Sequence, residues 1–262
     1  MPSALLAERA PMTAFRAVNQ PAKKAVTPYG LPVIENCATC KLRKDNYFCK
    51  LSDNSTREWD RIKHVTSYPE GALLFMEGEP ARGVHILCRG RVKLVTTNSE
   101  GKTFILKIAQ PGEIFGLNSI VTGRPYEVTV ETMQPSQFVY VGREEFTRFM
   151  KENTEACMRV VHQLGQECHS AYEVIRSLGL ASSVSGKLAK FLSDWSAEGK
   201  LSEGAVRIKL ALTHEELAQL IGCSRESVTR TLSDFKKQHL LELSGSTLLV
   251  WNRPALQELA AS

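Results

Sequence analysis

The sequence has no apolar run that approaches the roughly 18 to 20 residues of a membrane-spanning helix. Its first residues also lack the apolar segment of a secretory signal. These two absences predict a cytoplasmic protein without a membrane partner. The net charge of +5 is small for 262 residues, so composition gives only a weak indication of an anionic partner.

The motifs of common enzyme classes are missing as well. There is no phosphate-binding loop, nucleophile elbow or zinc-protease motif, and the six histidines are scattered along the chain. We therefore expect no enzymatic activity. Seven cysteines, an odd number, argue against a disulfide scaffold. In a cytoplasmic protein we expect cysteines to act as thiols, redox groups or metal ligands.

Composition and periodicity divide the chain into five segments, and together they predict an α+β fold. Residues 1–34 are rich in Ala and Pro, which predicts a flexible tail. Residues 35–50 form an arm with three cysteines. Short apolar runs punctuated by glycines over residues 51–148 are typical of an antiparallel β-roll, a jelly-roll-like sensory domain. Residues 149–179 predict one long dimerisation helix, and residues 180–262 a winged helix-turn-helix domain.

A heptad pattern marks the long helix. Apolar or small residues recur at alternating intervals of four and three positions, at Cys157, Val161, Leu164, Cys168, Ala171, Ile175 and Leu178. Such a narrow stripe is typical of a two-helix coiled coil, so we predict a homodimer with these seven residues in its interface. The alternative is a helix that lies on its own β-domain. In the predicted interface the two cysteines are small apolar residues and not ligands.

The stretch "LTHEELAQLIGCSRESVTRTLSDF" predicts two short helices joined by a tight turn. Thr213 and Glu216 have the spacing of a capping box, Gly222 permits the turn, and Ser224 can cap the second helix. This order of cap, glycine turn and second cap predicts a helix-turn-helix.

The outward face of the second helix carries residue types that read DNA. Arginine can bind guanine O6 and N7, and glutamate can accept a hydrogen bond from cytosine N4, so we predict base contacts from Arg225, Glu226, Thr229 and Arg230. Phosphate contacts are predicted near the helix N-termini, from Thr213, Ser224 and Ser227. Residues 180–262 hold ten Lys/Arg and nine Asp/Glu, so bulk charge adds no support. The alternative is a structural helix pair with a solvated face.

The element "IGCSRESVTRTL" closely resembles the recognition element of the CRP/FNR family of bacterial transcription regulators. The segment "FMEGEPARGVHILCRGRVKLVTTNSEGKTFILKIAQPGEIFG" resembles that family's sensory β-roll, and the likeness covers roughly residues 51–262 in the family's order. The resemblance implies a homodimer on a palindromic, TGTGA-like site of double-stranded DNA, with half-sites about 34 Å apart. It also implies RNA polymerase as a partner.

The family's cyclic-nucleotide pocket carries Gly-Glu-Leu followed by Arg-Ser or Arg-Thr. In this chain Leu117 follows Gly116, and Tyr126 and Glu127 stand where the arginine pair belongs. A carboxylate at the phosphate position repels an anion. We therefore expect that cyclic AMP does not bind.

The arm stretch "ENCATCKLRKDNYFCKL" contains three closely spaced thiols, Cys37, Cys40 and Cys49. Oxygen-sensing members of the family hold a [4Fe-4S] cluster through N-terminal cysteines and one from the β-roll, so the resemblance implies such a cluster here. The third cysteine stands farther away than in the usual pattern, and the family's β-roll ligand falls near Val139. Cys88 is the remaining candidate for the fourth ligand.

The predicted function is therefore a dimeric, DNA-binding transcription regulator that an oxygen- or NO-sensitive iron–sulfur cluster controls. Three alternatives to the cluster stay open from the residues alone: a zinc site, a thiol redox pair, or no cofactor. The alternative function is a similar regulator that responds to a small molecule in the β-roll and carries a zinc or thiol-redox arm.

Overall fold

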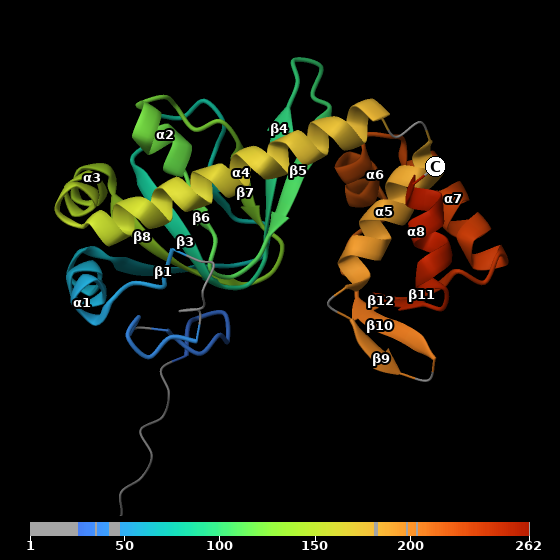
Figure 1. Ribbon diagram of the computed structural model, residues 1–262, viewed down its shortest axis with the longest axis horizontal. Helices are drawn as coiled ribbons and strands as arrows, with labels where there is room; N and C mark the ends of the chain where they lie inside the picture. Colours follow the sequence, from blue (N-terminus) through green and yellow to red (C-terminus); the bar gives the residue numbers. More distant parts are fainter. Residues whose placement is uncertain are drawn as a thin grey trace, which may run out of the picture.

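The computed structural model describes residues 26–34, 36–41, 48–180, 183–197, 199–202 and 204–261. It consists of a β-roll and a smaller body with its own sheet, joined by a long helix that crosses the front of Figure 1. This confirms the predicted α+β fold of a roll, a long helix and a winged helix-turn-helix. Among the described helices, none has both the length and the apolar character of a membrane span.

Two four-stranded antiparallel sheets form the roll, in the orders β1-β8-β3-β6 and β2-β7-β4-β5. Both contribute to one core, which includes Val84 and Phe138 of the first sheet and Val92 and Val130 of the second. Gly101, at φ 81°, lies in the turn of the β4–β5 hairpin. The bounds are β1 His64–Tyr68, β2 Leu73–Phe75, β3 Gly83–Arg89, β4 Val92–Thr97, β5 Thr103–Ala109, β6 Ile114–Phe115, α2 Leu117–Thr122, β7 Thr129–Thr132 and β8 Ser136–Gly142.

Part of the predicted tail packs on the roll. Residues 26–34 make a turn in which Leu31 donates a backbone hydrogen bond to the buried Thr27, and Ile34 donates one to Gln137 Oε1 of β8 at 3.1 Å. Within the segment predicted as a flexible tail, residues 1–34, this part therefore finds a hydrogen-bond partner on the sheet. Residues 1–25 lie outside the described residues.

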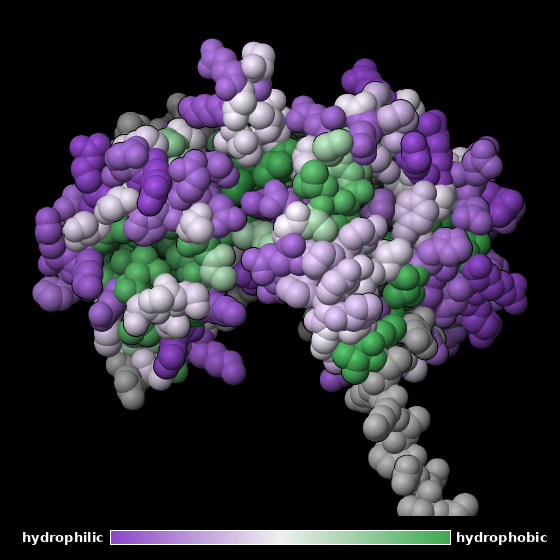
Figure 2. All heavy atoms as spheres, turned by 180° about the vertical axis from the view of Figure 1, so that it is seen from behind, coloured by the Kyte–Doolittle hydropathy of each residue, from purple (hydrophilic) through white to green (hydrophobic). Residues whose placement is uncertain are grey.

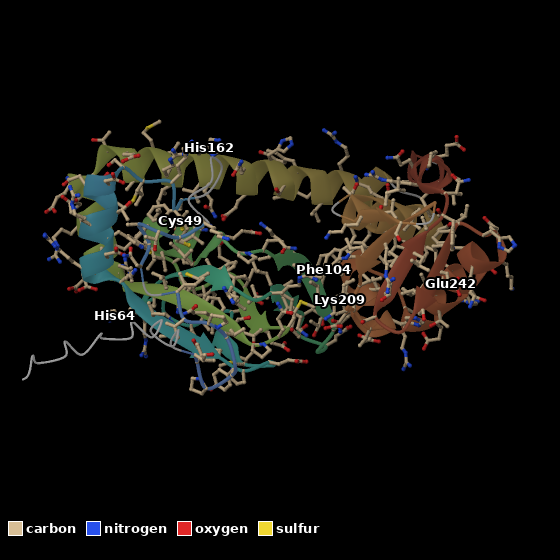
Figure 3. The ribbon with its side chains drawn as sticks, turned by 90° about the horizontal axis from the view of Figure 1, so that it is seen from below. Cys49, His64, Phe104, His162, Lys209 and Glu242 are labelled. Carbon is tan, nitrogen blue, oxygen red and sulfur yellow. The ribbon has the colours of Figure 1, made fainter. Side chains whose placement is uncertain are left out.

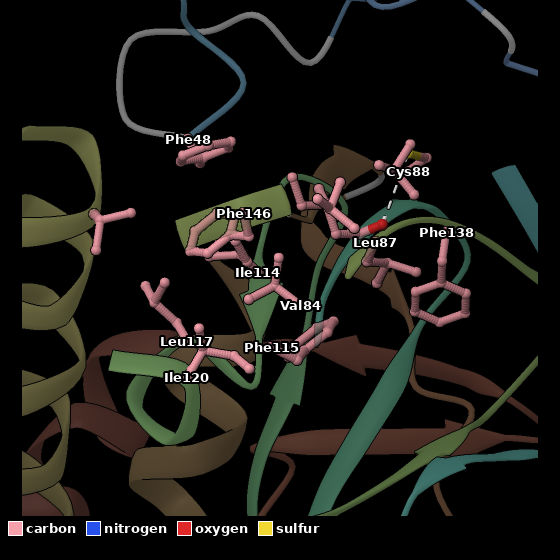
Figure 4. Packing of buried hydrophobic residues seen from close by; sticks show 14 of the residues in the cluster. Phe48, Val84, Leu87, Cys88, Ile114, Phe115, Leu117, Ile120, Phe138 and Phe146 are labelled. Atoms are coloured by element: carbon pink, nitrogen blue, oxygen red, sulfur yellow. Dashed lines mark hydrogen bonds between the residues drawn. The ribbon is translucent and has the colours of Figure 1, made fainter. Parts of the chain in front are cut away.

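Aromatic rings anchor the cysteine arm to the roll. Phe48 is 1% exposed, and its ring centroid lies 5.0 Å from that of Trp59 on α1 (Asp53–Ile62). Trp59 in turn contacts Phe146 and Phe149 of α3 (Arg143–Glu152). Figure 4 shows Phe48 above Phe146 and the rest of the core. Burial of these large rings stabilises the arm against the body of the domain.

The long helix α4 (Thr154–Leu180) begins five residues later than the predicted start at residue 149. Residues 149–152 belong to α3, and Asn153 separates the two helices. Asn153 Oδ1 accepts a hydrogen bond from the Ala156 N–H at 3.1 Å, and its Nδ2 donates to Ser55 Oγ at 2.8 Å. Asparagine favours such helix ends because its side chain replaces the missing backbone partner. The break therefore ties the start of α4 to α1.

The C-terminal body packs four helices against the sheet β11-β12-β10-β9. Its core includes Leu192, Leu217, Val228, Phe235 and Leu248. The predicted wing is the β11–β12 hairpin, while the β9–β10 hairpin was not predicted. The bounds are α5 Val184–Ser196, β9 Lys200–Ser202, β10 Ala205–Lys209, α6 His214–Ile221, α7 Arg225–Lys237, β11 Leu241–Ser244, β12 Thr247–Val250 and α8 Arg253–Ala261.

The two bodies touch where α6 packs against β5. Figure 2 shows this division from behind: the bodies meet along their upper half, and a notch separates them below. Lys93 of β4 lies between Glu131 of its own sheet, at 3.1 Å, and Glu216 of α6, at 3.4 Å. The Arg91 guanidinium lies 4.9 Å from the centre of the Trp195 ring. Polar contacts therefore link the roll directly to the helix-turn-helix.

Candidate DNA interface and cysteine pocket

The helix-turn-helix has the caps that the sequence predicted. Thr213 Oγ1 accepts the Glu216 backbone N–H at 3.1 Å, and the Glu216 carboxylate accepts the Thr213 N–H at 2.9 Å, which completes the capping box. Gly222 ends α6 at φ 67°, a left-handed conformation that glycine adopts without strain. Ser224 Oγ accepts the Ser227 N–H at 3.2 Å and opens α7.

The outward face of α7 presents the predicted base-reading residues. Arg225, Glu226 and Arg230 are exposed in its first two turns. Thr229 is also exposed, but its hydroxyl donates to the Arg225 carbonyl at 3.0 Å and lies 2.9 Å from Nδ1 of His214 on α6. Two arginines and a glutamate are therefore available to base edges, while the Thr229 hydroxyl is already engaged within the protein.

The predicted phosphate-contacting hydroxyls lie at helix N-termini. Thr213 and Ser224 are both exposed and cap α6 and α7, and Ser227 is half-buried with its Oγ 3.0 Å from Ser224 Oγ. The N-terminal ends of these helices present backbone N–H groups and the positive end of the helix dipole, which favour an anion.

The apolar stripe on α4 differs in phase from the predicted one. Leu164 of the predicted seam packs against the core of the roll and Cys157 is half-buried. The exposed stripe shares Val161, Cys168 and Ile175 with the prediction. Its other members, Met158, Gly165 and Tyr172, were not predicted. Ala171 is exposed too, and the side chain of Leu178 lies outside the described residues.

The stripe exposes large apolar side chains, as a protein interface does. Val161, Ile175, Tyr172 and Met158 are exposed by 56%, 65%, 63% and 61%. Together with Gly165 and Cys168, these residues recur at intervals of three and four, the spacing of a coiled-coil seam. Large apolar side chains gathered on one helix face indicate a surface that a partner covers.

Four cysteines meet in one pocket, although they come from distant parts of the chain. Cys37, Cys40 and Cys49 of the arm line it together with Cys88 of β3, and Ile34, Trp59, Ile86 and Val139 complete its walls. Figure 3 shows Cys49 on the side of α4 that faces the roll. Cys88 is 8% exposed and its Sγ lies 3.7 Å from the Ile86 carbonyl, the dashed line in Figure 4. The pocket thus contains the four cysteines that the sequence singled out.

Burial raises the pKa values of the Cys37, Cys49 and Cys88 thiols and so disfavours their deprotonation. It raises the pKa of Cys49 far above its usual value, and the neighbouring Cys88, Cys37 and Cys40 raise it further. Burial and the charges of Cys37 and Cys40 raise the pKa of Cys88 to about 12. Because each thiolate destabilises the next, deprotonation of the whole set requires a positive centre among the sulfurs.

The arrangement does not match a preformed site for a single ion. Within the part of the chain that the structure describes, no group of three or more His, Cys, Asp or Glu side chains is placed to hold one metal ion. The free space in the pocket is about 10 Å³, roughly enough for one water molecule. Occupation by a larger group therefore requires the side chains that line the pocket to move apart.

A lysine that no motif predicted contacts the pocket. Lys63 Nζ donates to Cys37 Sγ at 3.2 Å and to Asp60 Oδ1 at 2.5 Å, and its side chain is only 6% exposed. Burial raises the pKa of the Cys37 thiol, Lys63 lowers it, and Asp60 raises it. Lys63 and Asp60 lie three residues apart at the end of α1, a spacing that carries no sequence signal for a cysteine contact.

The positions of the family's cyclic-nucleotide arginine pair have other roles here. Tyr126 is buried, stacks on Phe75 with ring centroids 3.8 Å apart, and donates its hydroxyl to the Gly83 carbonyl at 2.8 Å. Glu127 is exposed and accepts hydrogen bonds from Asn118 Nδ2. Arg124 is also exposed. These three side chains thus offer a phosphate no buried cation.

A hollow of about 680 Å³ lies between α4 and the roll. Its lysine, Lys107, is paired with Glu113, and Glu167 lies opposite, with a pKa that burial raises. His162, Gln163 and His169 are also among its lining residues. The hollow is large enough for a small molecule, but two carboxylates and one paired lysine do not favour an anion.

Comparison with known proteins gives two domain matches and a set of regulators. Residues 65–153 match the cyclic nucleotide-binding domain family, and residues 186–259 match the Crp-like helix-turn-helix domain family. A "CRP-like cAMP-activated global transcriptional regulator" of Mycobacterium tuberculosis is 29% identical over 184 residues, which cover 70% of this chain and 82% of that protein. The "cAMP-activated global transcriptional regulator CRP" of Salmonella typhimurium is 24% identical, covering 77% of this chain and 97% of that protein.

Solved structures share the fold. FixK2 from Bradyrhizobium japonicum superposes with a TM-score of 0.68 at 23% identity, covering 77% of this chain and 98% of that one. The c-di-GMP responsive regulator CLP from Xanthomonas campestris gives 0.69 at 19% identity, covering 76% of this chain and 99% of that one. The two domain matches stand in the family's order and together span more than half of the sequence. The chain therefore belongs to the CRP/FNR family of DNA-binding transcription regulators.

Proposed function

We propose that this regulator binds a palindromic, TGTGA-like DNA site as a homodimer and that a [4Fe-4S] cluster in the cysteine pocket controls its activity. The observation that carries the proposal is the convergence of Cys37, Cys40, Cys49 and Cys88 on one pocket, in a chain that ends in a helix-turn-helix. Both relatives are described as activated by cyclic AMP. We propose a different signal for this chain, because its residues at the cyclic-phosphate position are Tyr126 and Glu127.

The chemistry of the donor set supports a cluster over a single ion. A structural zinc site needs its four sulfurs about 2.3 Å from one point, and no such grouping occurs among the described residues. In a cluster each thiolate binds a different iron, so the sulfurs stand farther apart. When bound, the cluster supplies positive charge for four thiolates and a centre that oxygen or nitric oxide can attack. The apolar walls of the pocket limit access of water.

The residues that directly follow the arm contact the start of α4, the part of the molecule that a sensor must move. The Ser52 N–H, just after the cysteines, donates to the Glu155 carboxylate in the first turn of α4 at 3.0 Å, and Ser55 Oγ donates to it at 3.1 Å. Asn153 at the start of α4 donates to the same Ser55. Because Ser52 follows the arm directly, we infer that displacement of the arm disturbs these contacts at the start of α4. We infer that loss of the cluster shifts the helix between two packings and so alters the spacing of the two α7 helices.

The dimer is proposed to form along the exposed stripe of α4, with a second copy of the chain as the occupant. The stripe of Met158, Val161, Gly165, Cys168, Tyr172 and Ile175 supports a parallel two-helix seam, and its two-fold axis matches a palindromic DNA site.

Glutamate in place of Val161 or Ile175 is expected to produce monomers, because each dimer then buries two like charges in its seam. The loss of association should be at least tenfold, measured as the dimer dissociation constant by sedimentation or small-angle scattering. Gln166→Glu is the matched control, since it adds the same charge at an exposed position off the stripe. Equal behaviour of the seam variants and the control contradicts this interface.

Cyclic AMP is not the proposed signal. In this chain Tyr126 and Glu127 replace the pair that the family uses for the cyclic phosphate, and Tyr126 is already committed to Phe75 and the Gly83 carbonyl. The hollow beside α4 supports the second candidate, a regulator that binds a small neutral or cationic molecule there.

The proposed function is tested by DNA binding under controlled atmosphere. Protein loaded with iron and sulfide without air is titrated onto a fluorescent TGTGA-like palindrome at fixed salt, then again after exposure to air, and again with added cyclic AMP. We expect the dissociation constant to change at least tenfold with air and to stay unchanged with cyclic AMP. Absence of iron in the loaded protein, or equal affinity before and after air, overturns the cluster-based signal. If affinity changes with cyclic AMP but not with air, the signal is a nucleotide bound in the β-roll and not a cluster in the cysteine pocket.

A further inference from the structure

Lys63 places a buried ammonium group against the cysteine pocket. Its side chain is 6% exposed, and Nζ lies 3.2 Å from Cys37 Sγ. Asp60, three residues earlier, accepts from the same ammonium at 2.5 Å. Building on the proposed cluster, we propose that Lys63 raises the reduction potential of the iron–sulfur centre through its hydrogen bond to Cys37, and that Asp60 lowers it.

Two observations separate this role from that of an ordinary surface ion pair. An exposed Lys–Asp pair three residues apart contributes little and stays in water, whereas this lysine is buried, which costs solvation free energy unless each donor finds a partner. Lys63 Nζ has both Asp60 Oδ1 and Cys37 Sγ within hydrogen-bond distance, so the buried group has partners for its donors. One of its donors is directed at a sulfur that is a proposed ligand.

The sign of the effect follows from charge alone. Reduction adds one electron to the centre, and no bond to a cysteine forms or breaks. Positive charge and hydrogen bonds at a ligand sulfur stabilise the more negative, reduced form, and nearby negative charge destabilises it. Removal of the Lys63 charge therefore lowers the potential, while removal of the Asp60 charge raises it. A purely structural ion pair predicts no such opposition, because both variants break the same contact.

The test uses the full chain, loaded with iron and sulfide without air, and begins with an iron count for every variant. Dithionite, with redox mediators, then supplies electrons while the visible absorption and paramagnetic signal are followed. At a fixed potential we expect Lys63→Met to lower the ratio of reduced to oxidised protein at least tenfold, which is a shift of about 59 mV for a one-electron couple. Asp60→Asn is expected to raise the ratio.

Two controls isolate the charge. Lys63→Arg keeps the positive charge and is expected to stay within about threefold of the wild-type ratio, a shift smaller than the tenfold criterion. Lys236→Met removes a lysine charge from exposed α7, in the other body, and should leave the ratio unchanged. If Lys63→Met loses its iron, the proposal is tested by Asp60→Asn alone, which keeps the lysine. An increase in its ratio of reduced to oxidised protein then supports the proposal, and no change overturns it.

The outcomes separate this inference from the proposed function. Full iron in the variants with unchanged potentials, or shifts of the same sign in Lys63→Met and Asp60→Asn, overturns the role of Lys63 while the cluster stands. A wild-type protein that takes up no iron overturns both.

Discussion

Replacement of Arg225 by alanine is expected to weaken binding to the palindromic site by about 2 to 6 kcal/mol, because a dimer loses two guanine contacts of about 1 to 3 kcal/mol each. Arg225 is exposed at the first position of α7, directly after the Ser224 cap, and its guanidinium is free of the helix-turn-helix core. The change is measured by fluorescence anisotropy at one salt concentration, since phosphate contacts make every affinity salt-dependent.

A base contact by Arg225 is recognised by a loss of affinity that is larger on the palindrome than on a duplex of unrelated sequence. Affinity for a scrambled duplex of the same length should fall much less than affinity for the palindrome, because non-specific binding depends on phosphate contacts. Arg225→Lys keeps the charge but loses the two-pronged geometry, so it should resemble the alanine variant on the palindrome and the wild type on the scrambled duplex. Lys237→Ala, at the exposed end of α7, is the control. Equal losses on both duplexes assign Arg225 to the phosphate backbone.

Serine in place of Cys88 is expected to reduce the iron of the loaded protein from about four per chain to below one, because a hydroxyl is a poor ligand for a cluster that is held by thiolates. Cys88 is the sulfur that the β-roll contributes to the pocket, and the arm supplies the others. Iron and sulfide analysis with the visible spectrum measures the loss. The variant should also bind the palindrome as air-treated wild type does.

Cys223→Ser is the matched control, since Cys223 packs in the other body and its side chain is half-buried. Retention of its iron shows that the loss in Cys88→Ser is specific to the pocket. If Cys88→Ser keeps about four irons per chain, Cys88 is not a ligand and another residue is the fourth ligand. Since a serine at this position is buried, near-ultraviolet circular dichroism is needed to confirm that the roll remains folded.

Local pattern predicted the elements well because each has a strong period or cap. The Thr213–Glu216 box and the Gly222 turn were visible as spacing and recur as hydrogen bonds in the structure. The phase of the α4 stripe was harder to predict. The helix carries two apolar faces, one against the roll and one toward solvent, and Leu164 belongs to the first. A heptad pattern in the sequence does not show which apolar residues of the helix face the roll and which face a second copy of the chain.

The cysteine pocket shows the same limit. Cys88 was singled out because no other roll cysteine was available, and only the packing of the arm against β3 and β8 brings it to Cys37 and Cys49. Lys63 gave no signal, because its contact with Cys37 joins residues 26 positions apart across a tertiary interface. Sequence thus indicated which residue types do the chemistry, and tertiary packing decides which of them meet.

The position of Lys93 limits what is lost electrostatically when the two bodies separate. When α6 leaves the roll, Lys93 keeps Glu131, and the carboxylate of Glu216 keeps the Thr213 N–H. Separation therefore leaves Lys93 and Glu216 each with a partner, so loss of the ion pair between them leaves no unpaired charge. A signal at the arm, or the DNA itself, therefore has to overcome the packing of α6 on β5 and the Arg91–Trp195 contact in order to reposition the reading helices.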